Sequence, residues 1–263
     1  MQDIALQNTT EHCFHTSAVE QKLSKKRRKN MTQKKTSTTT ESTISLEAIR
    51  TTKLKVQLVG TSDLILNKKA RSFEREEIFK QSHPKGTKIP AEIQQPYNMW
   101  EKLITSINWR DPITYHDDDY SLYNEEEWKN YMENNAPCIL GKAFQESFKE
   151  TFISCGFKDS TGKSGADLKR TVSVSVKNPI TFAQAGYDQH LAMTNGLNKV
   201  NVLTQQNQFM GWTCDIEITF LEGTFPRETI LALVQMSGNF IGVGSRRGEG
   251  YGRYTVGKIE VKQ

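Results

Sequence analysis

The sequence predicts an α+β fold, a ferredoxin-like (RRM-like) sandwich with a large insertion and a C-terminal glycine-rich loop. The order of patterns along the chain supports this. The N-terminal half shows a strand pattern, an insertion, a helix and a strand, and the C-terminal half shows a strand, a helix, a glycine-rich loop and a strand. A β-α-β order that occurs twice is typical of the ferredoxin-like fold. The 263 residues are enough to bury a hydrophobic core.

The first 44 residues differ in composition from the rest. They contain the basic block "KLSKKRRKNMTQKK" and the low-complexity stretch "TSTTTEST". Segments of this kind bury too little apolar surface to fold, so residues 1–44 are predicted to be a disordered basic and polar tail. The tail is either a tether for nucleic acid or simply solvated, and Met31 is a second plausible start. Residues 45–263 are predicted to form one domain, with residues 67–136 inserted into it.

In the N-terminal half of this domain, alternation of Leu54, Val56 and Leu58 with polar residues predicts a strand near residues 52–66, bent in "TSDLILN". The insertion carries a helix pattern in "KKARSFEREEIFKQ" and an acidic, aromatic stretch, which suits a lid or a partner-binding element. After it, apolar residues every three or four positions predict an amphipathic helix that ends at Gly156. These residues are Leu140, Phe144, Phe148 and Phe152.

The C-terminal half begins with an alternating strand at residues 171–176. Residues 158–170 and 178–211 carry few periodic signals and are expected to form loops. Residues 212–221 alternate again and predict a strand. A helix follows, with Thr224 as its N-cap, Pro226 near its first turn and Gly238 at its end. The last strand lies in "YGRYTVGKIEVK".

The stretch "FIGVGSRRGEGYGRYTV" joins this helix to the last strand. Glycine is needed where the backbone has positive φ or lies against a ligand. Backbone N–H groups of such a loop can form an anion nest, and its three arginines can bind phosphate. Tyr251 and Tyr254 are candidates for stacking on bases, although alternation in the strand can bury one of them. The alternative is a glycine hairpin with solvated arginines.

This stretch resembles the C-terminal glycine-rich loop of the RAMP superfamily, the repeat-associated RNA-binding proteins of CRISPR systems. "APCILGKAF" is loosely similar to the element that opens the first helix of that family. The resemblance is closest to backbone crRNA-binding subunits or their phage-encoded relatives. It implies binding of single-stranded nucleic acid, RNA in the first place and DNA as the alternative, with weak sequence preference. It also implies self-association along the strand or contact with other complex subunits, with the insertion touching the neighbour. The implied nucleic-acid-binding residues are Lys142, Gly242, Gly244, Ser245, Arg246, Arg247, Gly248, Gly250, Tyr251, Gly252 and Arg253.

Whether the protein is an enzyme stays open, and the residues favour a binding protein. Endonucleases of the superfamily use a histidine base, and none of the histidines in the folded region lies in the first helix. His190, near Tyr187, is the candidate base of the alternative, a metal-independent endoribonuclease. A structural or protein-interaction module without nucleic acid is the third hypothesis. No metal or other cofactor is expected, because the carboxylates at Asp117–Asp119, Asp188 and Asp215 do not suggest a converging site.

Charge and cysteine content set the cellular context. The formal net charge of +5 and the pI of about 8.9 permit a nucleic-acid partner. None of the four cysteines (Cys13, Cys138, Cys155 and Cys214) has metal-binding spacing, which favours reduced thiols and a cytoplasmic location. No apolar run reaches the length of a membrane span, so no membrane partner is expected.

Overall fold

The computed structural model describes residues 50–193 and 200–262. The expected tail at residues 1–44 lies outside the described residues. The main sheet has four antiparallel strands in the order β5-β8-β1-β9. They are β1 (Thr51–Gly60), β5 (Val172–Val176), β8 (Thr213–Leu221) and β9 (Tyr254–Lys262). Helix α6 (Gly141–Ser154) precedes β5 and helix α9 (Arg227–Met236) precedes β9. This strand order and connectivity confirm the ferredoxin-like prediction.

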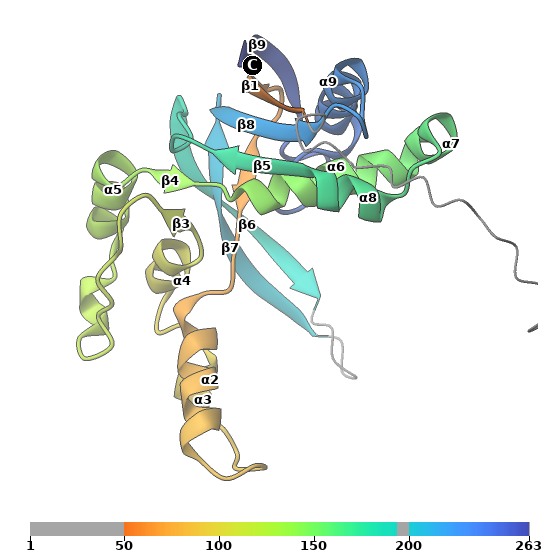
Figure 1. Ribbon diagram of the computed structural model, residues 1–263. Coiled ribbons are helices and arrows are strands. Elements are labelled where there is room, and N and C mark those ends of the chain that lie inside the picture. The colour runs from red at the N-terminus through yellow and green to blue at the C-terminus, as the bar shows by residue number, and fades with distance from the viewer. Residues whose placement is uncertain (1–49, 194–199, 263) are drawn as a thin grey trace, which may run out of the picture. The chain divides into compact units, whose positions relative to one another are not determined.

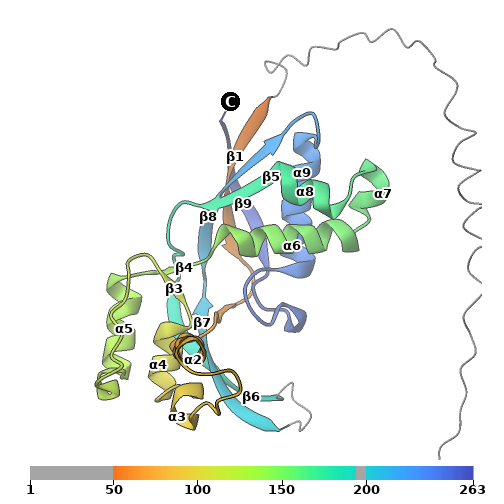
Figure 2. The ribbon, with the colours of Figure 1, turned by 60° about the horizontal axis from the view of Figure 1, so that its bottom comes forward.

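Both helices cover the same face of this sheet (Figures 1 and 2). Alternation in β1 points Leu54, Val56 and Leu58 toward the helices, while Lys53 and Gln57 are exposed. Helix α6 contributes Phe144, Phe148 and Phe152 to the core, and α9 contributes Ile230, Leu233 and Val234. Each fully buried side chain of this size stabilises the fold by about 1.5–3 kcal/mol. The apolar spacing of the sequence therefore specifies which face of each element is covered.

A second sheet contains β2 (Leu64–Leu66), β7 (Asn201–Met210) and β6 (Gln184–Met193), in the order β2-β7-β6. The prediction of a surface loop over residues 178–211 was wrong, because β6 and β7 pair from Gln184↔Met210 to Met193↔Asn201. Polar residues occupy both faces of much of this ribbon, so no apolar alternation marks it. Its pairing partner and its contacts with the insertion hold it in place.

The chain between β2 and β4 (Pro137–Cys138) lies outside the main sheet. It forms α2 (Arg71–Ser82), α3 (Ala91–Gln94), α4 (Met99–Thr105), β3 (Asn108–Trp109), the 3-10 turn η2 (Tyr120–Leu122) and α5 (Glu125–Asn134). Strand β3 pairs with β4. The buried amide of Asn207 in β7 accepts a hydrogen bond from Trp128 Nε1 at 2.9 Å and donates one to Leu103 O at 2.8 Å. The insertion is therefore fastened to the β6–β7 hairpin, beside which it lies in Figure 1.

Two further segments differ from expectation. The predicted loop at residues 158–170 instead contains most of two short helices, α7 (Phe157–Thr161) and α8 (Gly165–Thr171). Ser164 and Asp167 form a capping box at the start of α8. Helix α9 has Pro226 rather than Thr224 at its N-cap, and it continues through Gly238 as the π-turn η3 (Ser237–Ile241). Gly238 is there for packing, since a Cβ would lie 2.1 Å from Tyr254 O.

Candidate nucleic-acid interface

The glycine-rich loop, Gly242–Arg253, is docked along the bend between β1 and β2. Val243 N donates to Gly252 O at 2.9 Å and closes the base of the loop. Ser245 N donates to Ile65 O and Gly252 N to Asp63 O, both at 2.8 Å. These three N–H groups are therefore used within the protein, and an anion nest has only other N–H groups of the loop to draw on.

Most of the glycines are explained by this docking. Gly252 has φ of 70°, and a Cβ there would lie 1.8 Å from Val243 O. Gly244 has φ of 86°, and a Cβ there would lie 2.5 Å from Ile65 O. Gly248 is different, because it has no positive φ and a Cβ would meet nothing within 4 Å. The loop's own fold therefore requires glycine at residues 244 and 252 but not at residue 248.

Arg246 points toward strand β6 rather than into solvent. Its guanidinium donates hydrogen bonds to Asp188 and Glu249 and lies 4.8 Å from the ring centre of Tyr251. The hydrogen bond that Arg246 donates to Glu249 raises the pKa of the guanidinium above its ordinary value. His190 Nδ1 lies 2.8 Å from Asp188 Oδ2 in the same cluster. A phosphate would have to displace a carboxylate to reach this guanidinium in full.

The other predicted loop side chains also have partners. Arg247 Nη1 lies 2.9 Å from Glu150 Oε2 on α6, and Arg253 Nη2 donates to Arg247 O at 3.3 Å. Tyr254 is fully buried, so its ring cannot stack on a base, as alternation in the strand allowed. Tyr251 is half-buried beneath Arg246.

A groove of about 300 Å³ lies beside the loop, between the exit of β2 and the first turn of α6. It brings Lys142 together with Gly244 and Ser245 and adds Lys68, which the sequence analysis missed. Both lysines are exposed, and neither forms an ion pair in the part of the chain that the structure describes. Glu146, which also lines the groove, is held by Lys169 at 2.8 Å. The groove is therefore positively charged.

The first turn of α6 adds to this charge. Its N-cap is Leu140, which supplies no side-chain acceptor. Of the first three N–H groups of this helix, only that of Ala143 donates within the described chain, to Leu140 O at 2.9 Å. Uncapped N–H groups and the helix dipole favour an anion at a helix N-terminus. The signal in the sequence that could have pointed to Lys68 was the pair Lys68-Lys69, which follows the short apolar run "LIL" after one residue, Asn67.

His190, the candidate base, does not lie beside Tyr187 on the same face of strand β6. Successive residues of a strand face opposite sides, and Tyr187 points away from His190, with its ring 5.8 Å from that of Trp100. His116 contacts Glu127 at 2.6 Å within the insertion, and His83 stacks on Phe79. Among the described residues no group of three or more histidine, cysteine or acidic side chains is placed to hold a metal ion.

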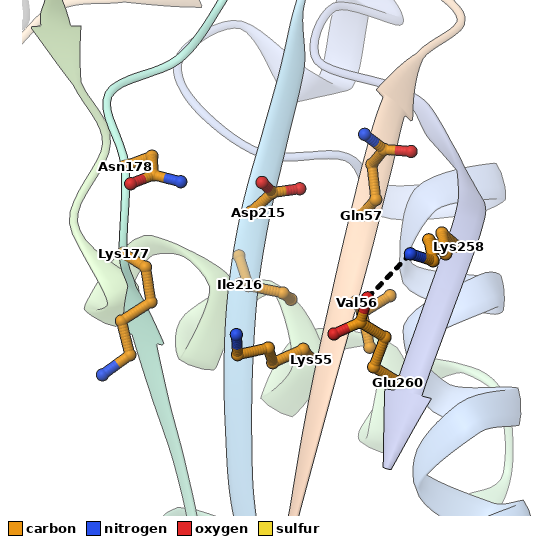
Figure 3. A pocket seen from close by; sticks show the side chains of 9 residues that line it. All are labelled: Lys55, Val56, Gln57, Lys177, Asn178, Asp215, Ile216, Lys258 and Glu260. Atoms are coloured by element: carbon orange, nitrogen blue, oxygen red, sulfur yellow. Dashed lines mark ion pairs between the residues drawn. The ribbon is translucent and has the colours of Figure 1, made fainter. Parts of the chain in front are cut away.

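The uncovered face of the main sheet was the other place to expect nucleic acid in an RRM-like fold. Figure 3 shows a depression on this face, lined by three lysines, Asp215 and Glu260 and by no aromatic ring. Lys258 pairs with Glu260 at 2.8 Å, and Lys177 pairs with Glu217 at 3.3 Å. Bases have no ring to stack on here, and carboxylates offset the lysines.

Comparison with known proteins gave one kind of match. No family model matches the sequence, and no curated protein matches it. Among solved structures, a chain of the cryo-EM structure of a type III-B Cmr-beta complex bound to cognate target RNA is similar, with a TM-score of 0.42 and 12% identity. The match covers 81% of this chain and 61% of that chain. No helix within residues 50–193 and 200–262 is long and apolar enough to cross a membrane.

Proposed function

We propose that this protein binds single-stranded nucleic acid, RNA or DNA, in the groove between the glycine-rich loop and the start of α6. One observation carries the proposal: Lys68 and Lys142 line a groove whose carboxylate is already held by another lysine. A strand's phosphates would be bound by these two ammonium groups and by the open N–H groups of α6. Gly248 leaves the tip of the loop open to close approach of a strand.

This arrangement assigns different roles to the residues implied by the resemblance. Lys142, Gly244 and Ser245 would contact the strand directly. Gly242, Gly250 and Gly252 shape the loop, and Arg246, Arg247 and Arg253 chiefly fix it to its surroundings. Binding that depends on phosphate contacts weakens as salt concentration rises. We therefore expect affinity that is salt-sensitive and that depends on the two lysines more than on the three arginines.

The test is fluorescence anisotropy with a labelled mixed-sequence 30-mer, as RNA and as DNA, at two salt concentrations. Lys68→Glu/Lys142→Glu should weaken binding at least tenfold and flatten the salt dependence. Lys158→Glu/Lys163→Glu is the matched control, because it makes the same change in net charge at two exposed lysines beyond the other end of α6. Equal weakening by both variants would mean that net charge alone drives binding and would overturn the assigned site. No binding by the wild type would leave a structural or protein-interaction module.

One observation favours a second candidate function, a metal-independent endoribonuclease. Asp188 Oδ2 lies 2.8 Å from His190 Nδ1, which orients the imidazole and leaves Nε2 without a partner in the described chain. A carboxylate that orients a histidine in this way is a common feature of general bases. Cleavage of the labelled RNA but not of the DNA, abolished by His190→Ala, would support this function. Intact RNA after prolonged incubation would exclude it.

Self-association along the strand is also part of the proposal. The end of the β6–β7 hairpin exposes Leu191, Met193, Val202 and Leu203. Clustered exposed apolar side chains commonly mark interaction sites. Mass photometry on 30-mer and 60-mer strands should show about twice as many copies on the longer one. Leu191→Ser/Leu203→Ser should lower that number without changing the affinity of a single copy for a short strand.

A further inference from the structure

The groove beside the glycine-rich loop has an apolar floor, which the binding of phosphate does not require. This floor is formed by Leu66, Ile107 and Ile139, which are almost fully buried. Leu140 adds an apolar wall and is 55% exposed. A phosphate alone gains nothing from such surfaces, because it stays hydrated and binds to N–H groups and ammonium ions. The floor therefore suits a flat, weakly hydrated group.

Three uncharged polar side chains stand around this floor. The amides of Asn67 and Asn108 and the hydroxyl of Ser245 line the groove. Within the described residues, these side chains have no hydrogen-bond partner in the protein, although each could make several. Asn67 is exposed and Asn108 is half-buried. Two free amides, each with a donor and an acceptor, can bind the edge of a nucleobase.

We propose that the groove seats one unstacked base of the bound strand, with its ring on the apolar floor and its edge bound by Asn67 and Asn108. Lys68 and Lys142 then bind the phosphates on either side of that nucleotide. Single-stranded nucleic acid is commonly read through bases that are turned out of the stack and hydrogen-bonded at their edges. The volume of about 300 Å³ is at the lower limit of small-molecule pockets, which fits one nucleotide rather than a duplex. The inference rests on the proposed function and departs from the weak sequence preference expected above.

The experiment compares the affinities of oligo(A), oligo(C) and oligo(U) 15-mers by anisotropy at one salt concentration. The wild type should show about a tenfold spread of Kd among them, the size that a good pair of base contacts gives. Asn67→Ala/Asn108→Ala should reduce this spread at least threefold, while binding remains salt-sensitive. Asn178→Ala is the matched control, because Asn178 lies on the uncovered face of the main sheet, and it should leave the spread unchanged (Figure 3).

Asn67→Ala alone guards against loss of folding, since Asn67 is exposed and follows β2, and it should reduce the spread in part. Salt-sensitive binding that needs Lys68 and Lys142 but shows equal affinity for the three strands would overturn the base seat and leave the proposed function standing. A spread that the asparagine variants do not change would also overturn it. Absence of binding to any strand would reject the proposed function and the base seat together.

Discussion

Arg246 in the glycine-rich loop donates a hydrogen bond to Asp188 in β6, 58 residues earlier in the chain. Their side chains are only 16% and 22% exposed, so water screens the contact weakly. The contact links the glycine-rich loop, which precedes the last strand of the main sheet, to the β6–β7 hairpin. The insertion packs against the same hairpin. Arg246, which the sequence predicts to bind phosphate, therefore also holds the loop against strand β6.

We predict that Arg246→Ala and Asp188→Ala each lower the free energy of unfolding by about 1 kcal/mol, the usual value for a hydrogen bond to a charged group in a partly exposed site. The double variant should lose less than the sum, because both changes remove the same contact. Urea unfolding of the four proteins measures this coupling. Arg247→Ala/Asp188→Ala is the control pair and should be additive. Full additivity of Arg246 with Asp188 would mean that the contact contributes nothing to stability.

The glycines of the loop should differ sharply in their tolerance of a side chain. Gly252→Ala adds a Cβ at positive φ against the Val243 carbonyl and should destabilise the fold by more than about 1 kcal/mol. Gly248→Ala meets no atom and should change stability by less than about 0.5 kcal/mol. Thermal unfolding followed by circular dichroism checks both values. Equal losses in the two variants would show that the docking described for Gly252 is not what requires glycine.

The carboxylate of Glu249 should report on the same cluster. The hydrogen bond from Arg246 lowers the pKa of Glu249 below that of glutamate in the unfolded chain. The stabilising contribution is therefore fully present above the unfolded pKa, about 4.3, and is lost as pH falls through the lower folded pKa. Carbon-13 NMR titration should show Arg246→Ala raising the pKa of Glu249. The pKa of Glu146, lowered by Lys169, is the internal control and should not move.

Cysteine reactivity should follow burial. Burial raises the pKa of the Cys214 thiol to about 12, and the thiolate is the form that reacts. Alkylation of the native protein at pH 8, followed by mass spectrometry, should modify half-buried Cys155 and leave Cys214 unmodified. Both should react in urea. Rapid modification of Cys214 without denaturant would mean that this side of the core opens easily.

The structure also shows which elements could be predicted locally. Leu54, Val56 and Leu58 predict β1 because one face of that strand meets apolar helices, and Phe144, Phe148 and Phe152 predict α6 for the same reason. The β6–β7 hairpin escaped prediction because its order depends on pairing between Tyr187 and Asn207 and their neighbours, and on contacts with the insertion. Neither the strand pairing nor the contacts with the insertion produce an apolar periodicity in the local sequence.

For the candidate site too, some features could be predicted from the sequence and others could not. The glycine spacing indicated a tight, specialised loop, and Lys142 was added to the site only by the resemblance. It did not reveal that Glu150 and Asp188 hold Arg247 and Arg246, because those carboxylates come from other elements. Nor did it place Lys68 beside Lys142, since that requires β2 and the start of α6 to line the same groove.

The ferredoxin-like order of strands and helices, the covered face of each and the position of the glycine-rich loop could all be predicted from the amino-acid pattern alone. Strands and helices produce apolar spacings of two and of three to four residues. Because these spacings involve residues close together in the chain, they can be recognised in a single sequence. Which lysine and arginine side chains lack a carboxylate partner could be seen only in the folded domain. That depends on how far each charge lies from carboxylates distant in sequence, such as Asp188 from Arg246, and such distances are set by packing of the whole domain.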